Sequence, residues 1–278
     1  MKKGICACAF PGDMTLEEVF HTAKKCGYDG VELSMNGAGE LTPDTSDAEL
    51  ERIRQLAEGA DISLYSVTSG LCWAYSLTSD DEEQREKAKA NFKRQIYIAS
   101  KLGCDTVLVV PGHVGVEFAP HLGVIDYQTA YDRALEGIRE LEVYARKLGI
   151  VIGIENVWNK FLISPVEMRG FVDAVGSEYV KAYFDVGNVA VNGYPEHWIR
   201  MLGERIVKVH FKDFKHSVGN INGFCDLLAG DVDYKAVMEA LRQTGYDGWV
   251  TAEMGPYSVS NEVSLAHASH AMDCILNY

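Results

Sequence analysis

Four ionisable residues of this 278-residue chain stand directly after short apolar runs, and their side chains are common metal ligands. Continuous apolar runs are typical of buried parallel strands, so each of these residues is expected at the carboxyl end of a strand. Three carboxylates and one imidazole suit Mn²⁺, Mg²⁺ or Co²⁺, with Zn²⁺ or Fe²⁺ also compatible. The pattern therefore predicts one divalent metal ion. Its candidate ligands are Glu155 after residues 151–154, Asp185 after 180–184, His210 after 206–209 and Glu253 after 249–252.

Two of these carboxylates are suited to moving a proton next to a carbonyl group. In an eight-stranded barrel the fifth and eighth strands lie about 135° apart, so Glu155 and Glu253 are expected to face a substrate from opposite sides. We expect the metal to polarise the carbonyl and stabilise an enediolate. One glutamate then removes a carbon-bound proton, and the other carboxylate returns one. This chemistry predicts an isomerase or epimerase acting on a hydroxyketone.

The elements that must position these residues alternate regularly along the chain. Eight alternating strands and helices predict a parallel sheet closed into a barrel, that is, an α/β fold with one (β/α)8 TIM-barrel catalytic domain over residues 1–278. A doubly wound open sheet is less favoured, because its four neighbouring strand ends would spread the ligands over about 15 Å. No G-x-G-x-x-G motif follows the first strand either. Strands are expected at residues 4–10, 28–33, 62–67, 106–110, 151–154, 180–184, 206–209 and 249–252, and helices at 15–26, 44–59, 81–102, 127–148, 164–175, 194–203, 233–244 and 261–275.

The composition indicates which classes of binding partner are unfavourable. The formal net charge is −14, from 26 Lys and Arg against 40 Asp and Glu, which disfavours nucleic acid and anionic membranes. The seven cysteines form no C-x-x-C pair, which predicts a reducing, cytoplasmic location. No run approaches the roughly 20 apolar residues of a membrane helix. A small molecule is the expected partner.

The residues around the four candidate ligands resemble the xylose isomerase-like superfamily of sugar isomerases and epimerases. In pattern, the chain is most similar to ketose 3-epimerases and to proteins labelled hexulose-phosphate isomerases or pentulose-phosphate 3-epimerases. The resemblance implies a metal held by all four residues, with Glu155 and Glu253 as the proton-transferring pair, and a homodimer or homotetramer. It is carried by Glu155 and by residues 184–188 (FDVGN), 209–213 (VHFKD), 230–234 (GDVDY) and 252–254 (AEM).

Two positions depart from the pattern of the ketose 3-epimerases. Those enzymes usually carry a histidine three residues after the aspartate ligand, where this chain has Asn188, and an arginine after the histidine strand, where Lys212 is the candidate replacement. We therefore expect a related but different sugar pocket, with Asn188 and Lys212 binding substrate. The superfamily also contains endonuclease IV, a nuclease with three zincs. That reading is disfavoured because the extra histidines are missing and the net charge opposes DNA.

Four further side chains near predicted strand ends are candidates for binding the sugar. His113 could reach a hydroxyl or bond only to backbone, and Trp158 could form an apolar wall or simply pack its loop. Lys160 is a candidate for a phosphate or a terminal hydroxyl, although a solvated lysine is the simpler reading. Glu32 could bind a hydroxyl, act as an accessory acid, or make a structural hydrogen bond.

Several alternatives remain open at this stage. A substrate phosphate is suggested by Lys160, Lys212, Lys215 and His216, with residues 217–220 as the best candidate cradle. The same metal and carboxylates could instead catalyse lyase or dehydratase chemistry on an oxidised sugar or a cyclitol. A third reading is a non-catalytic sugar-binding protein, which the retained pair of glutamates argues against.

Overall fold

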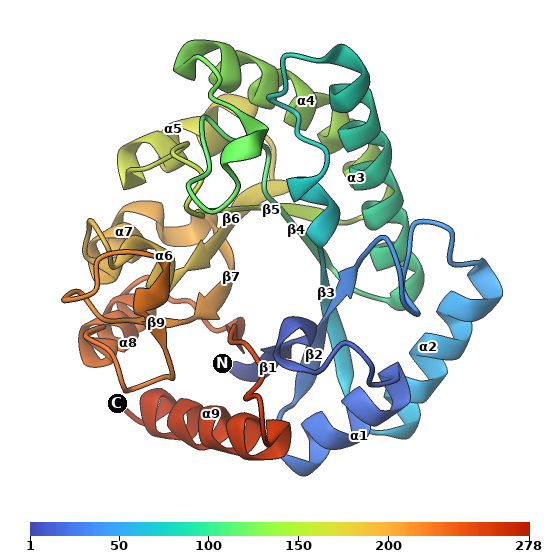
Figure 1. Ribbon diagram of the computed structural model, residues 1–278, viewed down its shortest axis with the longest axis vertical. Helices are drawn as coiled ribbons and strands as arrows, with labels where there is room; N and C mark the ends of the chain where they lie inside the picture. Colours follow the sequence, from blue (N-terminus) through green and yellow to red (C-terminus); the bar gives the residue numbers. More distant parts are fainter.

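Eight parallel strands close into a barrel with helices around it (Figure 1). The computed structural model describes residues 1–278. Neighbours around the barrel follow the order β1-β10-β7-β6-β5-β4-β3-β2. The predicted TIM barrel is confirmed, and the open-sheet alternative is excluded. Its strands are β1 (Lys2–Cys6), β2 (Gly30–Met35), β3 (Ser63–Ser69), β4 (Thr106–Val109), β5 (Val151–Glu155), β6 (Val180–Asp185), β7 (Ile206–Phe211) and β10 (Trp249–Ala252).

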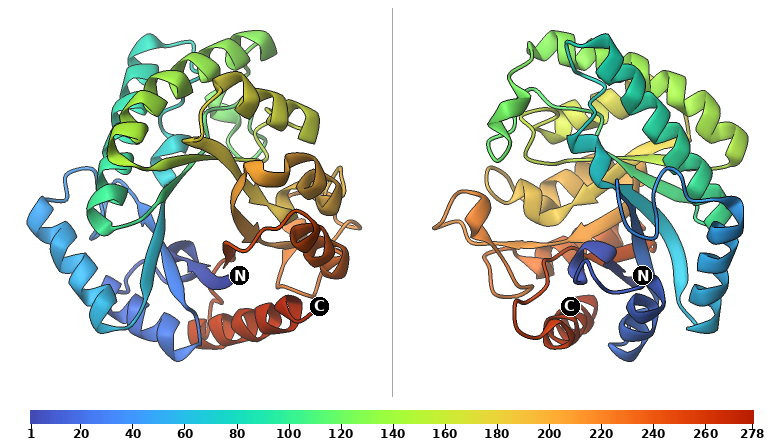
Figure 2. Two further views of the ribbon diagram at one scale, coloured as in Figure 1. Left: turned by 180° about the vertical axis from the view of Figure 1, so that it is seen from behind. Right: turned by 45° about the vertical axis from the view of Figure 1, so that its right-hand side comes forward.

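The helices lie outside the barrel, and their ends follow local signals in the sequence (Figure 2). Thr15 and Ser46 each form a capping box with the glutamate three residues later, at the starts of α1 and α2. Gly103 and Gly149 end α3 and α4 in the left-handed conformation. The main helices are α1 (Leu16–Lys25), α2 (Asp47–Gly59), α3 (Glu82–Leu102), α4 (Tyr127–Leu148), α5 (Pro165–Val175), α7 (Pro195–Leu202), α8 (Tyr234–Gln243) and α9 (Asn261–Leu276).

Some elements differ from those predicted. The first strand was expected at residues 4–10, but β1 ends at Cys6, because its ladder with β10 stops at Ile5 and its ladder with β2 stops at Cys6. The chain then forms the 3-10 turn η1 (Ala7–Ala9). The second helix starts at Asp47 rather than at 44, because Ser46 caps it. The unpredicted elements are the 3-10 segments η2 (Gly70–Trp73), η3 (Pro120–Leu122), η4 (Gly203–Arg205) and η5 (Ile221–Gly223), the one-turn helix α6 (Val186–Val189), and the hairpin of β8 (Asp213–Phe214) and β9 (Phe224–Cys225).

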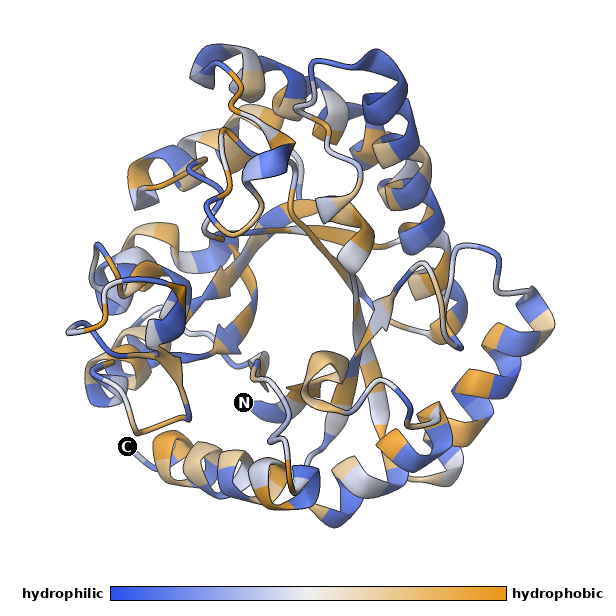
Figure 3. Cartoon of the chain, in the orientation of Figure 1, coloured by the Kyte–Doolittle hydropathy of each residue, from blue (hydrophilic) through white to orange (hydrophobic).

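The apolar core fills both the barrel and the layer between barrel and helices. Figure 3 shows apolar colouring along the strands and mixed colouring on the surrounding helices. Inside the barrel, Tyr183 packs where Gly153 leaves room, since a Cβ on Gly153 would lie 2.8 Å from the tyrosine ring. The hydroxyl of Tyr183 donates to Glu32, and its ring packs edge to face against His210 with 4.8 Å between the ring centres. No helix in the structure is both long enough and apolar enough to cross a membrane.

Candidate metal centre

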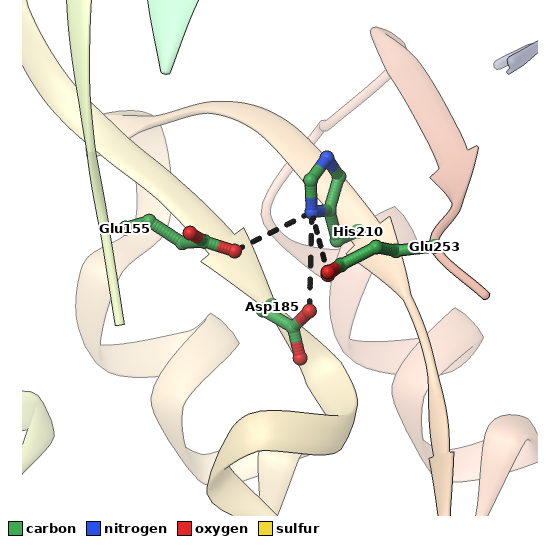
Figure 4. A group of neighbouring side chains, drawn as sticks. All are labelled: Glu155, Asp185, His210 and Glu253. Atoms are coloured by element: carbon green, nitrogen blue, oxygen red, sulfur yellow. Dashed lines mark hydrogen bonds and ion pairs between the residues drawn. The ribbon is translucent and has the colours of Figure 1, made fainter. Parts of the chain in front are cut away.

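Four side chains meet at the carboxyl mouth of the barrel. They come from β5, β6, β7 and the residue after β10, which are successive neighbours around the ring. One potential ligand atom from each lies within 4.8 Å of the others (Figure 4). The structure thus brings together the residues that the strand-end pattern singled out: Glu155, Asp185, His210 and Glu253.

The imidazole of His210 lies at the centre of the cluster with its two nitrogens in different environments. Its Nδ1 atom faces the carboxylates, at 3.2 Å from Glu253, 3.4 Å from Glu155 and 3.9 Å from Asp185. Its Nε2 atom lies 2.9 Å from Glu32 Oε1. A carboxylate can only accept a hydrogen bond, so Nε2 donates to Glu32. Nδ1 would likewise hold a proton toward the three carboxylates, and it would present its lone pair to a cation that takes the place of that proton.

Glu32 is held in place from two sides. It is fully buried, and its second oxygen accepts a short hydrogen bond from the hydroxyl of Tyr183. The strand register shifts directly before each residue, between Val31 and Glu32 on β2 and between Ala182 and Tyr183 on β6. Such irregularities bend a strand and re-aim its side chains. The structure therefore gives Glu32 a hydrogen-bonding role toward His210.

Asp185 is fixed through one carboxylate oxygen and leaves the other free. Its Oδ1 atom accepts a 2.6 Å hydrogen bond from the backbone N–H of Asn188, and Asp185 thereby caps the start of α6. The amide of Asn156 accepts from the Asp185 N–H at 2.9 Å and donates to the Asp185 carbonyl at 2.8 Å. The Oδ2 atom is buried without any hydrogen-bond partner. A buried carboxylate oxygen without a hydrogen bond is costly, and a bound cation would satisfy it.

Lys212 reaches the cluster from just past β7. Its ammonium lies 2.9 Å from Glu253 Oε2 and 3.8 Å from Asp185 Oδ2. It also lies 3.5 Å from the side-chain oxygen of Asn188 and 4.6 Å from the ring centre of Phe224. The lysine therefore contacts both the carboxylates of the cluster and two side chains beside it, Asn188 and Phe224.

The electrostatics of the cluster favour a cation. Burial raises the pKa of Glu155 and, more strongly, that of Asp185. Burial would also raise the pKa of Glu253, but the charges of Lys212 and His210 outweigh it and hold that pKa well below its usual range. Counting the glutamate on β2, four carboxylates face only these two basic side chains, so a further positive charge would be needed for all four to be ionised together. Three carboxylates and an imidazole nitrogen, with one oxygen lacking a hydrogen bond, fit a divalent cation.

A chamber of about 350 Å³ lies over the cluster. Four of the residues predicted to bind substrate line it: Glu32, Trp158, Asn188 and Lys212. The indole N–H of Trp158 donates to the Asn188 carbonyl at 2.8 Å, and its ring packs 5.0 Å from the ring of Phe224. Trp158 is thus a fixed wall of the chamber.

Two other predicted substrate residues lie outside this chamber. Lys160 is exposed and pairs with Glu117 at 3.0 Å. The imidazole of His113 lies 3.4 Å from the Leu122 carbonyl. The backbone of His113 is also fastened on both sides by the Thr78 hydroxyl, which donates to its carbonyl at 2.8 Å and accepts from its N–H at 2.9 Å. These contacts bond the histidine to neighbouring loop segments, and it does not line the chamber.

Sequence reasoning missed several other walls of the chamber. Cys6 and Thr68 come from β1 and β3, where uncharged side chains look like ordinary core residues. Phe118 comes from the long loop after β4, and Phe224 comes from the small hairpin. The only sequence signal for these two aromatics was an unexplained loop length between β4 and α4 and between β7 and α8.

Known proteins resemble this chain over almost its whole length. A model of the xylose isomerase-like TIM barrel family matches residues 20–275. The L-ribulose-5-phosphate 3-epimerase UlaE of Salmonella paratyphi A is 25% identical over 287 residues, which covers 98% of this chain and 93% of that protein. An inosose dehydratase of Lacticaseibacillus casei is 22% identical over 287 residues, covering 95% and 91%.

Solved structures share the same fold. A D-psicose 3-epimerase crystallised in the presence of D-fructose superposes with a TM-score of 0.82 at 22% identity, covering 100% of both chains. The IolI protein with a bound zinc atom superposes with a TM-score of 0.82 at 18% identity, covering 100% of this chain and 98% of that one. At these identities the superpositions establish a common barrel.

Proposed function

This chain belongs to the xylose isomerase-like TIM barrel family, and from that premise we propose that it is a metal-dependent sugar isomerase or epimerase. One observation carries the proposal. Glu155 and Glu253 enter the buried cluster from opposite sides, on strands separated by β6 and β7 (Figure 4). Two carboxylates so placed can take a proton from one face of a carbon atom and return it on the other face.

Two of the four cluster side chains would only bind the metal ion, and the other two would also transfer the proton. Asp185 and His210 would serve as ligands only, with His210 aimed by Glu32. A divalent cation, for which Mn²⁺ is our first candidate and Mg²⁺, Co²⁺ or Zn²⁺ are compatible, would polarise the substrate carbonyl and stabilise the enediolate. Glu155 and Glu253 would exchange the carbon-bound proton at their carboxylate oxygens.

Three other side chains would hold the substrate. The ammonium of Lys212 and the amide of Asn188 would hydrogen-bond sugar hydroxyls, since both line the chamber within reach of the cluster. Trp158 would form the wall against the sugar ring. Relatives named as ribulose-5-phosphate and fructoselysine 3-epimerases support a 3-epimerase among the possible isomerases.

The test is exchange of carbon-bound hydrogen with D₂O, followed by NMR over a panel of ketoses and ketose phosphates. We expect exchange at C3 that is lost with EDTA and restored by Mn²⁺ or Co²⁺. Exchange at C1 would instead indicate an aldose–ketose isomerase. No exchange with any ketose, together with binding of a sugar that does not depend on metal, would refute catalysis and favour a sugar-binding protein.

A second candidate function is dehydration of an oxidised sugar or a cyclitol. It is favoured by the similarity to an inosose dehydratase, and it would use the same proton abstraction next to a carbonyl. Here the abstracted proton and a hydroxyl leave the substrate as water. Incubation with an inosose and mass spectrometry of the product decide it: a product lacking one water would support the dehydratase, and an unchanged mass would exclude it for that substrate.

A further inference from the structure

A second cavity of about 520 Å³ opens beside the metal chamber, and we call it the outer cleft. Small-molecule sites usually have volumes of about 300–1,000 Å³, so the chamber of about 350 Å³ is large enough for a small ligand by itself. The outer cleft is additional space that adjoins the chamber. Both cavities are lined by Phe118, Val157, Trp158, Asn188 and Ile221.

Amide side chains supply most of the polar lining of the outer cleft. Each amide offers two N–H donors and one oxygen acceptor, which suits hydroxyl groups that both donate and accept. The side-chain amides of Asn156, Asn188 and Asn220 are already bonded within the protein, whereas those of Asn192 and Asn222 form no hydrogen bond. The five asparagines of the cleft are Asn156, Asn188, Asn192, Asn220 and Asn222.

Large apolar side chains stand exposed around the same cleft. The exposed fractions are 47% for Phe118, 54% for Ile163, 37% for Val191 and 44% for Ile221. Apolar side chains gathered at a concave surface mark a binding site more often than chance exposure. Apolar surface interleaved with amides matches a sugar ring, which presents C–H groups on its faces and hydroxyls at its edge.

The charges of both cavities argue against a phosphate group. The single basic residue of the outer cleft, Lys160, is paired with Glu117 at 3.0 Å. In the chamber, Lys212 and His210 already face the carboxylates of the cluster. To hold a phosphate dianion, a ligand normally bound by Arg or Lys, either lysine would have to leave its carboxylate partner. Of the residues predicted to bind phosphate, Lys215 and His216 line neither cavity, whereas Gly219 and Asn220 of the predicted cradle line the outer cleft without adding a positive charge.

We propose that the substrate is an uncharged, glycosylated ketose, with its ketose unit in the chamber and a second sugar ring in the outer cleft. This inference rests on the proposed isomerase or epimerase function and specifies its substrate. Trp158 and Asn188, which line both cavities, would then lie at the linkage between the two rings. The lining residues that belong to the outer cleft alone would determine the preference for the larger substrate.

The experiment compares D-fructose with derivatives of it that differ only in the group attached to the fructose unit. With Mn²⁺ present, kcat/KM for C3 proton exchange is measured for D-fructose, D-fructose 6-phosphate, and two disaccharides with a reducing fructose unit, the 1→4-linked lactulose and the 1→6-linked isomaltulose. We expect at least one disaccharide to exceed D-fructose by about tenfold, which is the scale of one well-placed apolar contact. We expect the phosphate ester to show no advantage over D-fructose.

Variants of the cleft test where the preference originates. Asn192→Trp and, separately, Ile163→Trp should fill the outer cleft and lower the ratio of disaccharide to fructose kcat/KM about tenfold. Val143→Trp is the matched control, because Val143 is 44% exposed on α4 and lines neither cavity, so the ratio should not change. Circular dichroism and thermal unfolding establish that each variant is folded.

The outcomes separate this inference from the function on which it rests. Exchange with D-fructose at least as fast as with both disaccharides, or fastest with the phosphate ester, would overturn the glycosylated substrate while leaving the epimerase standing. A ratio that stays unchanged in both cleft variants would also overturn it. No exchange with any of the four compounds, nor with the wider panel of ketoses, would remove the proposed function itself.

Discussion

Replacing Glu32 by glutamine is expected to weaken divalent-metal binding about 10- to 100-fold while leaving the fold intact. Glu32 is fully buried, with its Oε1 atom 2.9 Å from His210 Nε2 and its other oxygen accepting from the Tyr183 hydroxyl. This carboxylate holds the imidazole so that Nδ1 points at the other candidate ligands. Residues that orient a metal-binding histidine in this way typically contribute that much to metal affinity.

The size of the expected loss in metal affinity follows from the interactions that glutamine keeps at position 32 and from those that it loses. The side chain of Glu32→Gln has nearly the same shape, and its amide oxygen can still accept from His210 Nε2. It carries no charge, so a charge-assisted hydrogen bond becomes a neutral one of roughly half the strength. One negative charge also leaves the surroundings of the cation. A 10- to 100-fold loss corresponds to about 1.4–2.8 kcal/mol.

The assay is titration of metal-free protein with Mn²⁺ by isothermal calorimetry, with circular dichroism to confirm the fold. Tyr183→Phe is the matched control, because it removes the hydrogen bond to the other oxygen of Glu32 and keeps the charge. It should weaken Mn²⁺ binding less than Glu32→Gln does. A folded Glu32→Gln protein with the Kd of the wild type would refute the argument that Glu32 orients His210.

Three further predictions concern catalysis, metal and packing. Glu155→Gln and Glu253→Gln should each slow C3 exchange in D₂O by about 10²–10⁴-fold, because an amide cannot carry the proton; a near wild-type rate in either variant would contradict the two-glutamate mechanism. EDTA should lower the midpoint of thermal unfolding and Mn²⁺ should restore it, since a ligand at 100 times its Kd stabilises by about 2.7 kcal/mol; a midpoint unaffected by both would argue against a metal site. Gly187→Ala should destabilise by about 1–3 kcal/mol in urea unfolding, because its Cβ would lie 2.6 Å from the Lys212 carbonyl oxygen. Its control, Gly170→Ala on α5, meets nothing within 4 Å and should stabilise by about 0.5–1 kcal/mol; equal effects of the two would refute the packing argument.

The barrel was predictable because its signals are local. Apolar runs of strand length alternate with helices whose ends carry capping residues, such as Thr15 with Glu18 and Ser46 with Glu49. Eight such units indicated a closed parallel sheet, and the structure confirms it. The extent of the first strand was wrong, because its last paired residue depends on the neighbouring strands and not on its own composition.

The strand-end positions that predicted the four metal ligands gave less information about the loop residues around them. A strand-end position left open whether His113 would reach a substrate hydroxyl or bond only to backbone, and in the structure its imidazole lies 3.4 Å from the Leu122 carbonyl. Lys160 follows β5 closely, yet it pairs with Glu117 in the outer cleft. Loop conformation and the choice of ion-pair partner depend on residues far away in the chain. The oligomeric state, expected to be a dimer or tetramer, remains a prediction.

The sequence by itself determined which residues meet. Side chains alternate along a strand and parallel strands share one carboxyl edge, so a ligand-type residue closing each of four neighbouring strands has to arrive at one mouth. The tertiary structure alone decided what each residue does there. The contact of Glu32 with His210 spans 178 positions and that of Glu32 with Tyr183 spans 151, and two shifts of strand register aim the side chains. No local pattern encodes such pairings, because they exist only once the barrel has closed.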